Sequence, residues 1–147
     1  MALEFVASIG PVLPTEGAQL EDVRGTTNAA PAAPAAAATA PIFAAGEVIN
    51  VVTRNANEQL RVTLCVDRDN ANAAGFGNYR ITVNGVAVGP TAPGPTGTAQ
   101  QRTTVIDGIL TIAAPGTYAI GAQVTSITDV ETVAALSSLV VVANQFA

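Results

Sequence analysis

The sequence predicts an all-β protein: an antiparallel β-sandwich of jelly-roll or immunoglobulin-like type, preceded by an extended N-terminal arm. Two observations lead to this prediction. From about residue 46 onward, apolar and polar residues alternate with a period of two over several short stretches, which are punctuated by Asn-Gly, Asp-Gly and Pro-Gly pairs. Ahead of them, the segment 28–41 consists almost entirely of alanine and proline.

The clearest of the alternating stretches is 58–67, EQLRVTLCVD. Every second residue is apolar and the residues between are mostly polar: Leu60, Val62, Leu64 and Val66 alternate with Gln59, Arg61, Thr63, Cys65 and Asp67. A strand with one face in the core and the other toward water requires this pattern. The stretch therefore predicts a half-buried strand, with Cys65 as a small filler residue that contacts a second sheet or a subunit.

A β-hairpin is predicted over 79–89, YRITVNGVAVG. The Asn84-Gly85 pair favours a two-residue type I′ turn, because both central residues of that turn must adopt positive φ. One face of the first strand is formed by Tyr79, Ile81 and Val83. We expect Tyr79, like Tyr118, to be a core residue whose hydroxyl lies at the rim.

Three further stretches complete the predicted sandwich. In 103–112, TTVIDGILTI, the Asp107-Gly108 pair predicts a turn, and Pro115-Gly116 predicts the turn before the next strand. That strand has one apolar face, made by Tyr118, Ile120, Ala122 and Val124. The final stretch 137–146, SSLVVVANQF, is a near-continuous apolar run. It predicts a strand that is buried on both sides or packed against a neighbouring subunit.

Three zones are expected along the chain. Residues 1–27 form an N-terminal arm, in which EFVASI is a possible docking strand and TEGAQLEDVR (15–24) a single helical turn. Residues 28–45 form an Ala/Pro-rich linker, which is extended because each proline removes a donor and disfavours helix at the preceding residue. Residues 46–147 form the sandwich domain.

Composition excludes several classes of function. The 147 residues carry a net charge of -5, so we expect no nucleic-acid partner and no attraction to an anionic membrane. The chain has no apolar run of about 18 residues, which argues against a membrane-spanning helix. Its start, MALEFVASIGPVLP, lacks a basic leader, which predicts synthesis in the cytoplasm without secretion. The single cysteine excludes an internal disulfide.

Catalytic groups are scarce. The chain has no histidine and no lysine, so Ser-His, Cys-His and Schiff-base chemistry are all absent. Paired carboxylates are the remaining acid–base option, and the candidates are scattered: Glu47, Glu58, Asp67, Asp69, Asp107, Asp129 and Glu131. We therefore expect no enzyme, no catalytic residues and no cofactor.

One stretch, DRDNAN at 67–72, has the hard oxygen ligands that calcium takes: Asp67, Asp69, Asn70 and Asn72. An EF-hand loop would also need a ligand at 71, glycine at 72 and glutamate at 78, where this chain has Ala71, Asn72 and Asn78. Asp and Asn in a loop are also ordinary turn residues. No metal site is expected.

The layout resembles the small all-β proteins that decorate or cement the capsids of tailed bacteriophages or form their head fibres. PGTYAIGAQVTS followed by SSLVVVANQF, with Gly116-Thr117-Tyr118 opening an inner strand, also resembles the last strands of trimeric tumour-necrosis-factor-like jelly rolls. The resemblance implies a homo-oligomer, possibly a trimer, on the virion surface, and contacts with a major capsid protein or with like subunits. It implies no site residues.

The leading hypothesis is therefore a non-enzymatic virion structural protein that binds its neighbours through the N-terminal arm and subunit contacts. The alternative is an immunoglobulin-like or carbohydrate-binding module that recognises a surface glycan, with the loops 67–78 and 89–101 as its binding tip. A hydrolase that uses paired acids is a third possibility. Few aromatic residues are available to stack on a sugar: the chain has two Tyr and no Trp.

Overall fold

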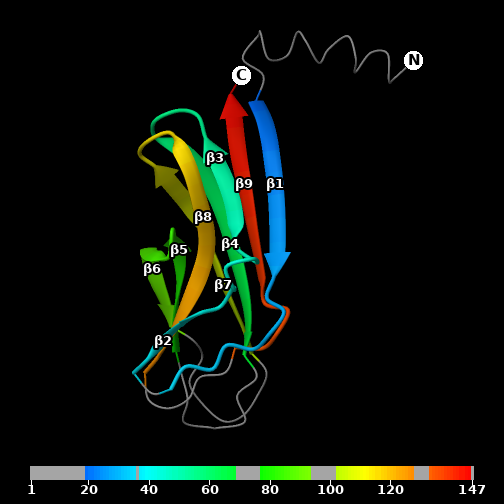
Figure 1. The fold of residues 1–147 in the computed structure, drawn as a ribbon, viewed down its shortest axis with the longest axis vertical. Coiled ribbons are helices and arrows are strands. Elements are labelled where there is room, and N and C mark those ends of the chain that lie inside the picture. Colours follow the sequence, from blue (N-terminus) through cyan, green and yellow to red (C-terminus); the bar gives the residue numbers. More distant parts are fainter. Residues whose placement is uncertain (1–18, 36, 69–76, 94–101, 128–132, 147) are drawn as a thin grey trace, which may run out of the picture.

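The computed structural model describes residues 19–35, 37–68, 77–93, 102–127 and 133–146, and in these ranges the protein is all-β (Figure 1). The strands are β1 (Gln19–Thr27), β2 (Thr39–Pro41), β3 (Ile49–Thr53), β4 (Glu58–Arg68), β5 (Gly77–Val83), β6 (Val86–Pro93), β7 (Arg102–Ile112), β8 (Gly116–Ser126) and β9 (Ser138–Phe146). No helix capable of crossing a membrane is found in the ranges described.

The strands form two antiparallel sheets. Sheet A has the order β1-β9-β4-β7, and sheet B has the order β2-β8-β5-β6, with β3 also paired to β8. Both β2 and β3 lie on the edge of β8 that faces away from β5, β2 beside residues 123–125 and β3 beside residues 116–120. They are thus two halves of one interrupted strand.

With β2 and β3 counted as one strand, the pairings are nested. The first strand pairs with the last (β1 with β9), the second with the seventh (β2/β3 with β8), the third with the sixth (β4 with β7), and the fourth with the fifth (β5 with β6). Eight strands nested in this way over two sheets are a jelly roll. The predicted fold class is confirmed, and of the two topologies left open it is the jelly roll.

The core lies between the sheets, where the predicted alternating faces meet. The four apolar residues of β4 are at most 3% exposed, and Ile120, Val124 and Tyr79 from sheet B are fully buried against them. On β9, Leu139 and Val141 also point inward. The hydroxyl at the rim that was expected for both tyrosines is wrong for Tyr79, which is 0% exposed. Tyr118 is half-buried, and its hydroxyl donates to the Ala114 carbonyl at 2.9 Å.

Of the turn predictions that depended on glycine pairs, those at Asn84-Gly85 and Asp107-Gly108 had different outcomes. Asn84 and Gly85 both have positive φ (51° and 78°) and connect the paired residues Val83 and Val86, which confirms the type I′ hairpin. The turn predicted at Asp107-Gly108 is wrong, because both residues lie inside β7. There Asp107 pairs with Thr63 of β4, so the ladder continues through the dipeptide.

The helical turn predicted at 15–24 is also wrong where the structure describes it, because residues from Gln19 onward belong to β1. All nine residues of β1 pair with β9, from Gln19 opposite Phe146 to Thr27 opposite Ser138. Partners over 100 residues away in sequence thus decide a conformation that local propensity left open. The possible docking strand in EFVASI lies outside the described residues.

Residues 28–35, here called the crossing segment, run from sheet A toward sheet B across the end of the sandwich opposite to the start of β1 (Figure 1). Ala32 and Val133 exchange two backbone hydrogen bonds, of 3.1 and 2.8 Å. Asn28 is fully buried, and Pro34 is buried. The segment is extended, as its prolines predict, but the structure packs it against the sandwich, and β1 and β2 on either side of it belong to the two sheets. The sandwich therefore begins before the expected boundary at residue 46.

Candidate interaction site

The outer face of sheet A is built from residues of all four of its strands. Because β4 turns Leu60, Val62 and Leu64 into the core, its alternate residues point outward, and the strand register aligns them with outward residues of β1, β7 and β9. Two rows cross all four strands: Val23, Val142, Arg61 and Ile109 form one row, and Gly25, Val140, Thr63 and Asp107 form the other.

This face is rich in β-branched apolar residues. Val23, Val105 and Ile109 are 61%, 59% and 63% exposed, and Val140 and Val142 between them are half-buried. We call these five residues the outer apolar face. An antiparallel sheet with one side in water normally places polar residues on that side. A sheet face with several large apolar side chains is instead typical of a surface that a partner covers.

One ion pair lies within the outer apolar face. Arg61 Nε and Nη2 donate to the two carboxylate oxygens of Asp107 at 3.2 and 2.9 Å, and the Thr63 hydroxyl donates to Oδ1 at 2.7 Å. The hydrogen bonds from Arg61 and then Thr63 hold the pKa of Asp107 below its ordinary value, and the same contact raises the pKa of Arg61. Because both charges are already paired, a partner can cover them without leaving an isolated buried charge.

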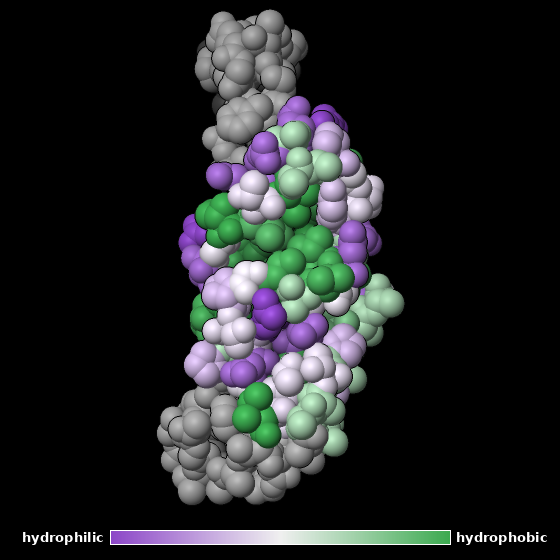
Figure 2. All heavy atoms as spheres, turned by 90° about the vertical axis from the view of Figure 1, so that its left-hand side faces the viewer, coloured by the Kyte–Doolittle hydropathy of each residue, from purple (hydrophilic) through white to green (hydrophobic). Residues whose placement is uncertain are grey.

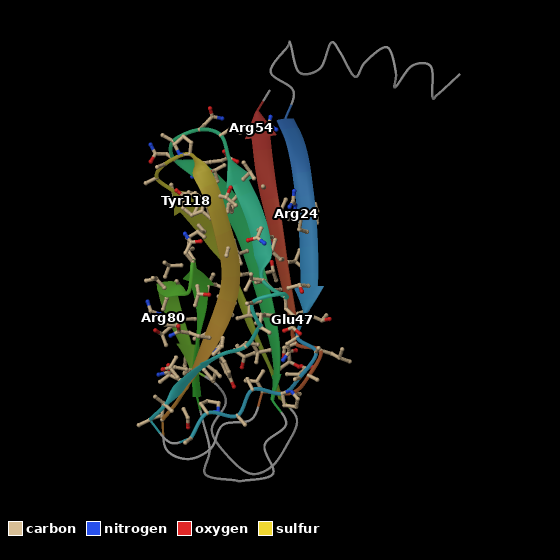
Figure 3. The ribbon with its side chains drawn as sticks, in the orientation of Figure 1. Arg24, Glu47, Arg54, Arg80 and Tyr118 are labelled. Carbon is tan, nitrogen blue, oxygen red and sulfur yellow. The ribbon has the colours of Figure 1, made fainter. Side chains whose placement is uncertain are left out.

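The two long sides of the sandwich, one beside β1 and the other between β6 and β7, differ in how the two sheets meet. On the β1 side, Arg24 Nη1 donates to the Asn50 carbonyl of β3 at 2.8 Å, so a side chain of one sheet bridges to the other. Figure 3 labels Arg24 on this side and Arg80 and Tyr118 on the opposite side. That opposite side, between β6 and β7, contains a small hollow with mainly apolar walls.

The hollow between β6 and β7 holds about 60 Å³ of free space and is lined on its apolar part by Val62, Ile81, Val88, Ile106, Ile109 and Leu110. Small-molecule sites take roughly 300 Å³ or more, so this hollow fits no more than a side chain. Ile109 also belongs to the outer apolar face, and the two features therefore meet along β7. Figure 2, which views the side where β6 lies, shows hydrophobic side chains gathered in its middle, with polar ones around them.

A second hollow, of about 320 Å³, is formed by β2, β5, β8 and the segment after β2. Thr39, Thr82 and Gln123 supply its polar groups, and Phe43 is the aromatic residue in its wall. Phe43 is only 2% exposed, so it offers little ring face for stacking. The hollow is large enough for a small ligand, but it lacks the exposed aromatic platform that sugar sites use.

Four of the acids considered as candidate catalytic residues lie apart from one another, and each makes its own hydrogen bonds. Glu47 accepts from the backbone N–H groups of Ala29 and Ala44 at 2.7 and 2.9 Å, and Glu58 accepts from that of Arg54 at 2.9 Å. Asp67 accepts from the Thr103 hydroxyl at 2.6 Å. Asp107 is in the ion pair described above.

The calcium-like stretch is described only at its start, since 69–72 lie outside the described residues together with Asp129 and Glu131. Where the structure does describe the chain, no group of three or more acids, cysteines or histidines lies together. Cys65 is half-buried on the outer side of sheet A, between Ser138 and Val105 in the register. The loops 67–78 and 89–101 are described only in part.

Sequence reasoning did not identify the outer apolar face. A signal for it was present in TTVIDGILTI, where both alternating sets contain apolar residues: Val105 and Ile109 on one side, Ile106, Leu110 and Ile112 on the other. A two-sided apolar strand was expected only in 137–146. There, over residues 138–143, the structure shows β9 with one buried face and one half-buried face.

No protein-family model matches the sequence, and no curated protein matches it. Among solved structures, a chain in the structure of the infectious bursal disease virus Gt strain aligns with a TM-score of 0.60 and 17% identity, over 83% of this chain and 33% of that chain. The VP2 subviral particle of the same virus aligns with a TM-score of 0.59 and 16% identity, over 83% of this chain and 32% of that one. Latent PorU from Porphyromonas gingivalis aligns with a TM-score of 0.54 and 9% identity, over 87% of this chain and 13% of that one.

These likenesses define a class by fold: the chain is a jelly-roll sandwich similar to part of a viral capsid protein, and it spans about a third of the length of the capsid chains it matches. A family 35 carbohydrate-binding module from Clostridium thermocellum also aligns, with 20% identity over 80% of this chain and 97% of that one, but its TM-score is 0.39. That value is too low to support an argument.

Proposed function

We propose that this protein is a non-enzymatic structural component of a virus particle, of the kind that decorates or cements a phage-like capsid. It acts at the virion surface and binds like subunits, or a major capsid protein, through the outer apolar face of sheet A. The observation that carries the proposal is that face: a four-stranded sheet that exposes Val23, Val105 and Ile109 around an ion pair that is already satisfied.

The size of the face agrees with this role. A sheet of four strands and about eleven residues has a projected area of roughly 650 Å², from strand spacing and rise. A stable protein–protein interface takes about 800 Å² from each partner, so the face and its rim are sufficient for one interface. Shared fold with capsid chains supports the same function, although a fold by itself accommodates many functions.

Charge supports a role outside the packaged genome. The net charge of -5 opposes binding to phosphates and favours contacts with other proteins. Capsid components of this kind are made in the host cytoplasm and then assemble, which agrees with the single cysteine. The resemblance to trimeric jelly rolls makes a homotrimer the first assembly to test.

The test is the solution mass of the chain by light scattering over a range of concentrations. We expect a multiple of 14.7 kDa for the unmodified chain. Ile109→Lys should raise the dissociation constant by roughly tenfold or more, because an unpaired charge in an apolar contact costs more than about 1.4 kcal/mol. The matched control is Val52→Lys on β3, where the valine is 50% exposed on the other sheet. A wild-type monomer at every concentration, with and without capsid protein, contradicts the proposal.

The glycan-binding alternative has one supporting observation, the hollow of about 320 Å³ on sheet B. If the protein is such a module, Gln123→Ala in the wall of this hollow should abolish retention on a glycan array and leave the solution mass unchanged. Retention of no glycan by the unmodified chain removes this alternative.

A further inference from the structure

Within the described part of the chain, the outer edge of β7 is open. Among the described residues, β7 pairs with β4 and with no other strand, so one side of its eleven-residue backbone has no partner strand there. An unpaired edge presents a row of N–H and C=O groups that can accept another strand. β7 also carries apolar side chains toward both faces, since Val105 and Ile109 point outward and Ile106 and Leu110 border the hollow.

The other edges are less suited to strand addition. β6 contains Pro90 and Pro93, which lack the N–H donor that a ladder requires. The edge formed by β2 and β3 is interrupted by residues 42–48 and includes Pro41. β1 is linked across to β3 through Arg24. β7 has no proline, and it is the longest of these edge strands.

The chain supplies one suitable occupant. Of the ranges that the structure does not describe, DNANAAGF, GPTGTAQQ and TDVET are polar or rich in small residues, whereas the first eighteen residues contain LEFVASI at 3–9. In this segment Leu3, Phe5, Ala7 and Ile9 alternate with Glu4, Val6 and Ser8. Seven residues extend over about 23 Å, which fits along β7.

Chain direction favours a second copy over the same chain. β1 begins at the end of sheet A where β7 finishes, and the two strands lie at opposite edges. A segment that passes over this end to reach its own β7 runs parallel to it, in a sheet that is otherwise antiparallel. An antiparallel arrangement in the same chain needs residues 10–18 stretched to nearly their full length of about 30 Å across the outer face. A second copy has neither restriction.

We propose that residues 3–9 of one copy add to the β7 edge of a second copy as an antiparallel strand, with one apolar side chain of the segment in the hollow between β6 and β7. The inference rests on the proposed function, because it names a second copy of the chain as the binding partner and the β7 edge, which borders the outer apolar face, as the contact. It uses a recognised binding mode, in which backbone hydrogen bonds give affinity and alternate side chains give specificity.

Cross-linking between two distinguishable copies tests the proposal directly. In a Cys65→Ser background, one copy carries Phe5→Cys, and the other carries Ile109→Cys and a mass tag; a short bismaleimide joins thiols that lie close together. We expect a cross-linked species containing one chain of each kind. The matched control replaces the acceptor by Val52→Cys on the other sheet, and it should give no such species. Equal cross-linking to both acceptors, or to neither, overturns the proposal.

Two further measurements separate the possible failures. Placing Phe5→Cys and Ile109→Cys in one chain at high dilution should give little internal cross-link, and an efficient internal cross-link overturns the assignment to a second copy. Deleting residues 2–13 should raise the dissociation constant at least about tenfold, because the docked strand is lost. If the deleted chain assembles as before while Ile109→Lys does not, this inference fails and the proposed function stands.

Discussion

Replacing Asn28 with alanine tests whether the crossing segment is part of the folded sandwich. Asn28 is fully buried, and its Nδ2 donates to the carbonyls of Ala30 and Ala134 at 3.0 and 3.1 Å. Its main chain is held as well, since its N–H donates to the Ser137 carbonyl and its own carbonyl accepts from Leu136. The side chain therefore joins the crossing segment to the residues just before β9.

The substitution removes two partly buried hydrogen bonds, which the Asn28 side chain donates to the carbonyls of exposed Ala30 and half-buried Ala134. At about 1 kcal/mol each, the expected loss in free energy of unfolding is about 2 kcal/mol. For a chain of this size that corresponds to a decrease in Tm of roughly 4–8 °C. Urea unfolding followed by circular dichroism measures the first quantity, and a thermal scan measures the second.

The control is Asn55→Ala, an exposed asparagine in the turn between β3 and β4. It should change stability by less than about 0.5 kcal/mol, as surface substitutions normally do. If Asn28→Ala is equally neutral, the crossing segment does not stabilise the sandwich, and residues 28–45 behave as the free linker that their composition suggested.

Two further predictions concern the Asp107 ion pair and the backbone conformation of Gly85. Because the folded pKa of Asp107 is lowered from 3.8, its ion pair stabilises the fold above that pH and loses the contribution as the pH falls through the folded value. The stability difference between wild type and Asp107→Asn should therefore be constant above about pH 5 and shrink in acid; an unchanged difference at low pH contradicts the assignment. Gly85→Ala should cost about 1 kcal/mol, since Gly85 has a φ of 78°, whereas Gly108→Ala, with open space around it and no positive φ, serves as the near-neutral control in the same urea titration.

The sequence predicts single residues of the candidate site, but it does not predict how they come together. Arg61 was placed correctly on the polar side of its strand, because alternation is a local property. Its partner Asp107 lies 46 residues away, and the following glycine suggested a turn there. The ion pair and the outer apolar face exist because β7 continues through this dipeptide beside β4, and neither strand specifies that register alone.

The sequence alone predicts a β-sandwich, the residues of β4, β5 and β8 that face the core, and the position of the Asn84-Gly85 hairpin turn. These features depend on periodicity and on backbone preferences within a few residues. The fold itself was needed to show that Gln19–Thr27 is a strand, that the alanine-proline segment packs across the end of the sandwich, and that the strands follow jelly-roll order. Those features depend on partners distant in the chain, such as Gln19 with Phe146, and local preference does not encode which distant strand offers the matching edge.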